Sequence, residues 1–329
     1  MFSMLTVLLA AQFMFISDRA SFWDPDKESA DTEQSQGENG PAEPVDFRQF
    51  KGKKVLLLVH GFNNTAEDAM STYHQINREI QALSDAKNKP LYDVIIGYLW
   101  PGHNDRLEYF SAERTTNKLA SRAALHLHAL SSFASEVDIF AHSMGNRLML
   151  GALSHLSTHT QKKKEQPYTM QTLEKILFPT QAEGFLHFWA KHHPVHAPIH
   201  AIQNFYSIAA AVADHSIDKD QPYYQSTQQC QNMYVFHSNR DDVLKFLFLI
   251  AEREEALGYE GLDKENEVSS NIQFIDCSSL VDGHSGYFRV KPLYQFIQKQ
   301  HANQTLAPNI AHNVELLANG LVARIKSAL

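Results

Sequence analysis

The fold of this 329-residue chain is decided by the stretch Val137-Asp138-Ile139-Phe140-Ala141-His142-Ser143-Met144-Gly145. The apolar run before Ser143 is typical of a buried strand, and a helical pattern follows Gly145. Small residues at Ala141 and Gly145 allow a strand and a helix to meet closely at a sharp turn. The stretch therefore predicts a serine held on a strained turn between a strand and a helix.

Strands and helices alternate on both sides of this turn. The runs 55–59 and 94–100 are apolar and lack alternation, as expected for parallel strands covered on both faces. Thr65 is predicted to cap a helix that begins after it. The pattern predicts an α/β fold, the α/β-hydrolase, in which a mostly parallel central sheet is flanked by helices. Further elements are expected over 65–83, 111–133, 146–158, 202–211, 233–237 and 272–276.

Changes in composition predict the domain organisation. Residues 1–23 begin strongly apolar without the basic residues that open a signal peptide, so we expect either the first strand or an export or anchor signal. Residues 24–46 are rich in acidic, Ser, Gln, Gly and Pro residues and are predicted to be a flexible linker or loop. The hydrolase domain is expected over 47–329, with a lid-like insertion at about 161–198, where the alternation stops.

Composition also limits the classes of partner. The formal net charge of −8 and the lack of a basic stripe exclude nucleic acid as an expected partner. Cys230 and Cys277 have no metal or redox spacing and are predicted to be reduced, buried thiols. The histidines over 192–200 lack helix-spaced H-E-x-x-H, so no metal and no cofactor are expected. A cytoplasmic location is favoured, with a periplasmic or membrane-anchored one through the N-terminus as the alternative.

Acyl transfer through a serine needs a base, an acid that orients the base, and amide donors for the oxyanion. Ser143 is the predicted nucleophile. His284 follows the last expected strand in a glycine-rich loop, in the chain order that this fold requires, and is the predicted base. Asp241 is the predicted acid. Asp242, which could exchange roles with Asp241 as a helix cap, and Asp214 are the alternatives.

The oxyanion donors are expected to be two backbone amides. The N–H of Met144 follows the nucleophile, and the N–H of Phe62 lies in the loop after the 55–59 strand, which faces the turn in this fold. His60 is expected to hold that loop by hydrogen bonds. His142 is expected to pack beside the turn and not to react, because it points away from the Ser143 hydroxyl.

Four motifs occur together in the chain: Val59-His60-Gly61-Phe62-Asn63-Asn64, Trp100-Pro101-Gly102, Ala141-His142-Ser143-Met144-Gly145-Asn146-Arg147 and Ser238-Asn239-Arg240-Asp241. In combination they resemble the bacterial α/β-hydrolase family of esterase/lipase superfamily enzymes of unknown function, over roughly residues 13–297. The resemblance implies that Ser143, Asp241 and His284 take the triad positions and that 15–19 forms the opening strand. The 161–198 stretch departs from that pattern.

The residues and the resemblance predict a serine hydrolase that acts on a carboxylic ester or related acyl substrate through a Ser-His-Asp triad and an acyl-enzyme. Thioesterase and acyltransferase activities are variants of the same chemistry. The alternative is a non-catalytic binding or envelope-associated protein on a hydrolase scaffold. The expected partner is a small acyl molecule, and the sequence specifies neither its acyl and leaving groups nor the oligomeric state.

Overall fold

The computed structural model describes residues 11–20, 28–35, 41–85, 89–103, 105, 108–161, 202–262 and 267–303. The predicted insertion at 161–198 lies outside these residues, except for residue 161. The histidines over 192–200 lie outside them as well. The strands are β1 (Gln12–Arg19), β2 (Glu28–Ser35), β3 (Glu43–Pro44), β4 (Lys54–Val59), β5 (Val94–Leu99), β6 (Glu136–His142), β7 (Ile202–Ile208), β8 (Cys230–His237) and β9 (Ile272–Asp276).

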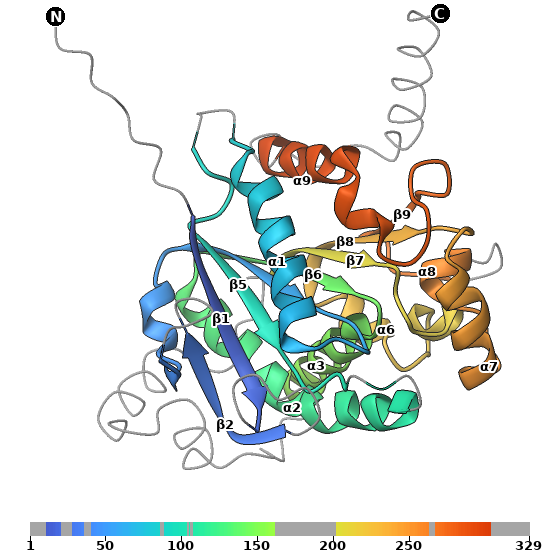
Figure 1. Cartoon of the computed structure of the whole chain (residues 1–329), viewed down its shortest axis with the longest axis horizontal. Coiled ribbons are helices and arrows are strands. Elements are labelled where there is room, and N and C mark those ends of the chain that lie inside the picture. Colours follow the sequence, from blue (N-terminus) through green and yellow to red (C-terminus); the bar gives the residue numbers. More distant parts are fainter. Residues whose placement is uncertain are drawn as a thin grey trace, which may run out of the picture.

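These strands form one sheet in the order β3-β2-β1-β5-β4-β6-β7-β8-β9 (Figure 1). From β1 to β9 each neighbouring pair is parallel. β2 and β3 add to the β1 edge in antiparallel fashion. The helices are α1 (Ala66–Gln81), α2 (Tyr109–Phe133), α3 (Met144–Gln161), α6 (Tyr224–Thr227), α7 (Leu249–Glu252), α8 (Leu257–Glu260) and α9 (Lys291–Asn303).

Helices cover both faces of the sheet. The chain passes from β4 through α1 to β5 on one side, then from β5 through α2 back across β4 to β6 on the other. Because such crossovers are right-handed, this reversal places α1 and α2 on opposite faces. α3 packs on α2, and α9 contacts α1 (Figure 1). The strands between these layers are shielded on both faces, which explains the uninterrupted burial of β5.

The predicted α/β-hydrolase fold, with its mostly parallel sheet and flanking helices, is confirmed. The predicted cap of α1 is confirmed as well. The Thr65 hydroxyl accepts from the Asp68 N–H, and the Asp68 carboxylate accepts from the Thr65 N–H. This reciprocal capping box satisfies donors of the first turn that have no partner within the helix. Cys230 and Cys277 are free and buried.

The N-terminal region corrects one prediction. The range 24–46, predicted to be a flexible linker or loop, contains β2 and β3. The polar composition of this range gave no sign of the two strands. They pair through backbone hydrogen bonds at the edge of the sheet, and such pairing does not require a pattern of apolar side chains. Residues 12–19 within the apolar segment 1–23 form β1, the first-strand alternative. No helix of the described residues is both long and apolar enough to cross a membrane.

Candidate active site

Ser143 lies at the turn between β6 and α3, with a backbone φ of 53°. Left-handed backbone is costly for a residue with a side chain and persists only where its surroundings hold it. The Ser143 N–H donates to the Ile208 carbonyl at 3.0 Å. The Ser143 carbonyl accepts from the N–H groups of Asn146 at 3.0 Å and Ala211 at 3.2 Å. The structure therefore has the strained strand-to-helix turn that the sequence predicts.

Two glycines bring the end of β4 against this turn. A Cβ on Gly145 would lie 2.5 Å from the His60 carbonyl oxygen, and a Cβ on Gly61 would lie 2.7 Å from the Ser143 Cβ. Real Cβ atoms do not approach other atoms so closely, so each position needs glycine. The loop after β4 is thereby placed directly beside Ser143.

Asn146 supports the turn and was not identified as a site residue from the sequence. Its fully buried side chain has Nδ2 within 3.1 Å of the carbonyls of Ala141, Ser143 and Ile208. An amide group has two N–H donors, which these three acceptors share. Its only sequence signals were its place three residues after Ser143 and its presence in the motif over 141–147. Asn146 ties β6 and β7 to the first turn of α3.

Asp241 and His284 are paired. The Nδ1 atom of His284 lies 2.7 Å from Oδ2 of Asp241, whose side chain is completely buried. Because a carboxylate only accepts hydrogen bonds, Nδ1 is the donor in this contact, and in the neutral form of the ring Nε2 therefore keeps its lone pair. The other oxygen, Oδ1, accepts from the Leu244 N–H at 3.0 Å. Asp241 therefore orients the imidazole and also caps the helical segment that follows.

The other two acidic candidates lie elsewhere. Asp242 is exposed, and the capping role considered for it is filled by Asp241. Oδ1 of Asp214 accepts from the His215 N–H at 2.7 Å and lies 3.1 Å from Nδ1 of that ring. Of the three acids proposed from the sequence, Asp241 is the one that contacts His284.

His142 supports His284 more directly than the sequence indicated. Its Nε2 donates to the His284 carbonyl at 3.0 Å, and the two ring centroids are 4.6 Å apart. Burial, with a further contribution from His284, lowers the pKa of His142 to about 3. The ring is therefore neutral at physiological pH. It supports the loop that carries His284 without adding a positive charge.

A pocket of about 320 Å³ lies beside Ser143 and His284 at the carboxyl edge of the sheet, which is the usual ligand site of open α/β sheets. Ser143 and His284 both line it, as do Phe62 and Met144, the predicted oxyanion residues. The remaining wall is mostly apolar, with Leu58, Val59, Ile76, Tyr109, Phe140, Val243, Leu244, Leu247, Phe248 and Phe288.

His60 is fixed on several sides at the end of β4. Its ring stacks on Trp100 with centroids 5.4 Å apart, and the backbone N–H of His60 donates to the Tyr73 hydroxyl at 2.8 Å. Burial and then the charge of Arg19 lower the pKa of His60 to about 3. A neutral, immobilised imidazole suits the expected role of holding the loop.

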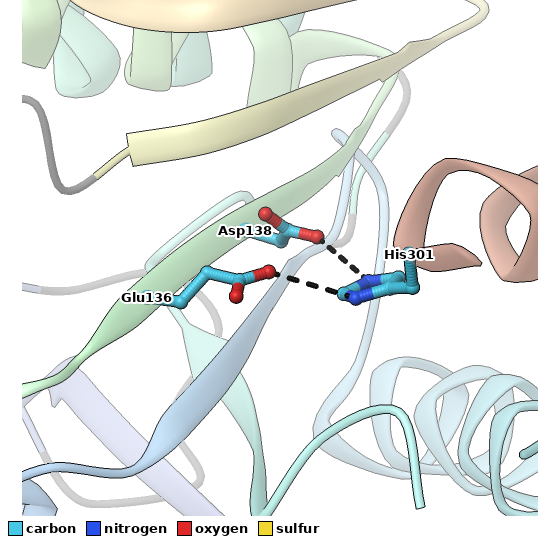
Figure 2. A group of neighbouring side chains, drawn as sticks. All are labelled: Glu136, Asp138 and His301. Atoms are coloured by element: carbon cyan, nitrogen blue, oxygen red, sulfur yellow. Dashed lines mark ion pairs between the residues drawn. The ribbon is translucent and has the colours of Figure 1, made fainter. Parts of the chain in front are cut away.

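Among the described residues, one group of side chains has the composition of a metal site. Glu136, Asp138 and His301 lie together where β6 meets α9 (Figure 2). Nε2 of His301 is 3.2 Å from Asp138, and Nδ1 is 3.5 Å from Glu136. Asp138 also accepts from Tyr92 and Asn204. Each carboxylate faces a different ring nitrogen, and Nε2 also lies 2.8 Å from the Tyr92 hydroxyl, so these contacts join α9 to the sheet. It lies at the opposite end of β6 from Ser143.

The sheet order, the strained serine turn and the residues gathered at the carboxyl edge define an α/β-hydrolase. The chain belongs to the family described as alpha/beta hydrolase of unknown function (DUF900), whose model matches residues 45–286. No curated protein matches the chain.

Solved structures provide two further similarities. The chain is similar to Est1E from Butyrivibrio proteoclasticus with bound ferulic acid, at 9% identity and a TM-score of 0.33, over 78% of this chain and 91% of that one. It is also similar to 2,6-dihydroxy-pseudo-oxynicotine hydrolase, at 11% identity and a TM-score of 0.34. That match covers 83% of this chain and 64% of the other, so the chain spans less than two thirds of that hydrolase.

Proposed function

We propose that the protein is a serine hydrolase that acts on a carboxylic ester, or a related acyl substrate, through an acyl-enzyme. The observation that carries the proposal is the 2.7 Å contact between His284 Nδ1 and Asp241 Oδ2, since His284 also lines the pocket of Ser143. An imidazole held with Nδ1 protonated offers Nε2 as a general base. A small-molecule acyl substrate needs no cofactor for this chemistry.

The reaction proceeds in two balanced steps. Ser143 Oγ attacks the ester carbonyl carbon while His284 Nε2 takes the hydroxyl proton, and the tetrahedral intermediate then expels the alcohol, which receives that proton. A water molecule attacks the resulting acyl-enzyme, again giving its proton to His284, and the carboxylic acid leaves as Ser143 is restored. Asp241 stabilises the imidazolium formed in each step.

The negative oxygen of the intermediate is assigned to the backbone amides of Phe62 and Met144. Met144 is the first residue of α3, and the first N–H groups of a helix have no partner within it. The positive end of the helix dipole adds to the attraction of that amide for an oxyanion. Gly61, the residue before Phe62, lies against Ser143, and Phe62 lines the same pocket, which supports the assignment of its amide.

Reaction with a fluorophosphonate probe tests this function. We expect one covalent adduct on the folded protein, located on Ser143 by mass analysis of peptides, because only a serine beside an oriented base is activated. Ser285→Ala is the matched control, since Ser285 lines the same pocket. It should leave labelling intact, whereas Ser143→Ala should abolish it. A folded protein that takes no label is a binding protein on a hydrolase scaffold, and the proposal is then wrong.

A further inference from the structure

An exposed apolar surface adjoins the pocket. It consists of five side chains, here called the apolar ridge: Val243, Phe246, Leu247, Leu249 and Ile250. The most exposed are Ile250, at 77%, and Phe246, at 55%. A helical segment on a protein surface normally turns polar side chains outward. A contiguous exposed apolar surface of this kind is typical of a binding site.

The ridge is held in a fixed position. Leu244 and Phe248, on the inner face of the π-helical segment η4 (Leu244–Phe248), are buried. Asp241 caps the start of this segment. At its far end, in α7, Glu252 accepts from Arg147 Nη2 at 2.7 Å and from the Tyr109 hydroxyl at 3.1 Å. The outward apolar side chains are therefore part of the packed structure.

The ridge continues the wall of the pocket. Val243 and Leu247 are exposed members of the ridge and also line the pocket that contains Ser143 and His284. Phe246, Leu249 and Ile250 belong to the same helical stretch as these two residues, so the stretch carries apolar side chains both on the pocket wall and on its exposed outer surface. Because two ridge residues also line the pocket, the arrangement favours an occupant that enters the pocket as well.

We propose that the ridge binds the apolar chain of the substrate, so that the substrate is an ester whose acyl chain extends beyond the pocket. The proposed serine hydrolase function places the ester group of that substrate at Ser143. Contact between the chain and the ridge removes apolar surface of both from water, which drives binding.

The charges around the ridge favour a single chain over a lipid bilayer. Helices that lie on membranes carry several Lys or Arg residues on their polar face. Over residues 243–250 the only charged residue is Lys245. Asp242 precedes this range, and the charged residues that follow it closely are Glu252, Arg253, Glu254 and Glu255. The whole chain has a formal net charge of −8. An anionic membrane would repel this surface, whereas an acyl chain needs no cations.

A chain-length comparison tests the ridge. The double variant Phe246→Gln/Ile250→Gln changes two exposed residues that do not line the pocket, so the fold should be retained. For p-nitrophenyl decanoate, kept below its aggregation concentration, we expect kcat/KM to fall about tenfold, because apolar contact with the chain is lost. For p-nitrophenyl acetate, kcat/KM should be unchanged. Leu280→Gln, another exposed apolar position, is the matched control and should change neither value.

Binding of decanoate, measured by calorimetry, separates this inference from the proposed function. Weaker binding to the double variant supports the ridge even if the protein hydrolyses no ester. The inference is overturned if the parent protein and the double variant bind decanoate equally and show the same chain-length preference. A decanoate effect that begins only when the ester aggregates indicates a surface for lipid aggregates, and a dimer that the double variant dissociates indicates a second copy of the chain. Either result overturns the assignment to a single acyl chain.

Arg19 carries a second, independent inference. It is buried at the end of β1, where Nε donates to the Trp100 carbonyl at 3.1 Å and Nη2 lies 3.1 Å from Nε2 of His60. A guanidinium only donates hydrogen bonds, so Nε2 of His60 accepts and the ring proton is on Nδ1. Nδ1 lies 2.7 Å from the Gly61 carbonyl oxygen and therefore donates to it.

The Gly61 carbonyl and the Phe62 N–H belong to one trans peptide, so they point in opposite directions. We propose that Arg19 is a positioning residue: it fixes the tautomer of His60 and, through it, the direction of the Phe62 N–H. This inference rests on the oxyanion role proposed for Phe62. Arg19 precedes residues 45–286, the part matched by the family model, so the role extends the site to β1.

Arg19→Met removes the donor to His60. We expect kcat to fall about 10- to 100-fold with KM little changed, because an oxyanion donor acts mainly in the transition state. Arg19→Lys, which keeps a donor, should recover part of the loss. Tyr98→Phe, which removes a buried hydrogen bond to Asp18 without touching His60, is the control for a purely structural effect. An equal loss of kcat in that variant overturns the role.

The tautomer of His60 can be read in the intact protein by ¹⁵N NMR of its ring nitrogens. Protonation at Nδ1 in the parent protein, shifted toward Nε2 in Arg19→Met, is the expected signature. It does not depend on any ester being hydrolysed, so it remains informative if the proposed function fails. Protonation at Nε2 in the parent protein contradicts the inference.

Discussion

Ser143→Ala is expected to lower kcat for ester hydrolysis on the order of 10⁶-fold, to the level left by binding and oxyanion stabilisation. The variant removes the attacking oxygen but keeps the small side chain that the left-handed turn at φ 53° accommodates. Turnover of p-nitrophenyl acetate, measured with the parent protein and the variant side by side, provides the comparison.

Folding must be shown to survive this change. The hydrogen bonds that hold the turn use the backbone N–H and carbonyl of Ser143, which alanine retains. The urea midpoint of unfolding should therefore stay close to that of the parent protein. A variant that folds and still hydrolyses the ester at a comparable rate rules out Ser143 as the nucleophile.

Asp241→Asn is expected to lower kcat by about 10⁴-fold. Asparagine can still accept the Leu244 N–H with Oδ1, so the cap of the following segment is kept. Its amide group instead faces His284 Nδ1 and donates to it, which places the ring proton on Nε2. Nε2 can then no longer accept the proton of Ser143. Steady-state kinetics at neutral pH measure the loss.

Asp242→Asn is the matched control, because it makes the same chemical change one residue away. Asp242 is exposed, and Asp241 already fills the capping position. We expect wild-type kcat and KM for this variant. If Asp242→Asn or Asp214→Asn abolishes activity while Asp241→Asn does not, the acid has been assigned to the wrong residue.

The serine turn was predictable because its causes are local. An apolar strand, small residues on either side of the serine and a helix start lie within a few residues of one another. The capping box of α1 is equally local, since Thr65 and Asp68 are three residues apart. Aliphatic runs likewise predicted the buried parallel strands. The polar strand β2 was missed because backbone pairing at a sheet edge has no such signature.

The site beyond the turn was only partly predictable. Chain order selected His284, but it could not choose between Asp241 and Asp242, because neighbouring side chains point in different directions once the loop folds. The support of His284 by His142 joins residues 142 positions apart, and the contact of Arg19 with His60 joins residues 41 apart. Neither pair is marked by spacing or composition.

Local patterns in the amino-acid sequence were enough to predict the alternating α/β architecture, the strained serine and the set of candidate acids and bases, since these depend on neighbouring residues. Three-dimensional folding alone decided which acid meets the imidazole, which buried arginine sets the histidine tautomer, and that apolar side chains continue from the pocket to the surface. Such relations depend on where distant segments come together, because hydrogen bonds and apolar contacts act over a few ångströms of space, however far apart the residues lie along the chain.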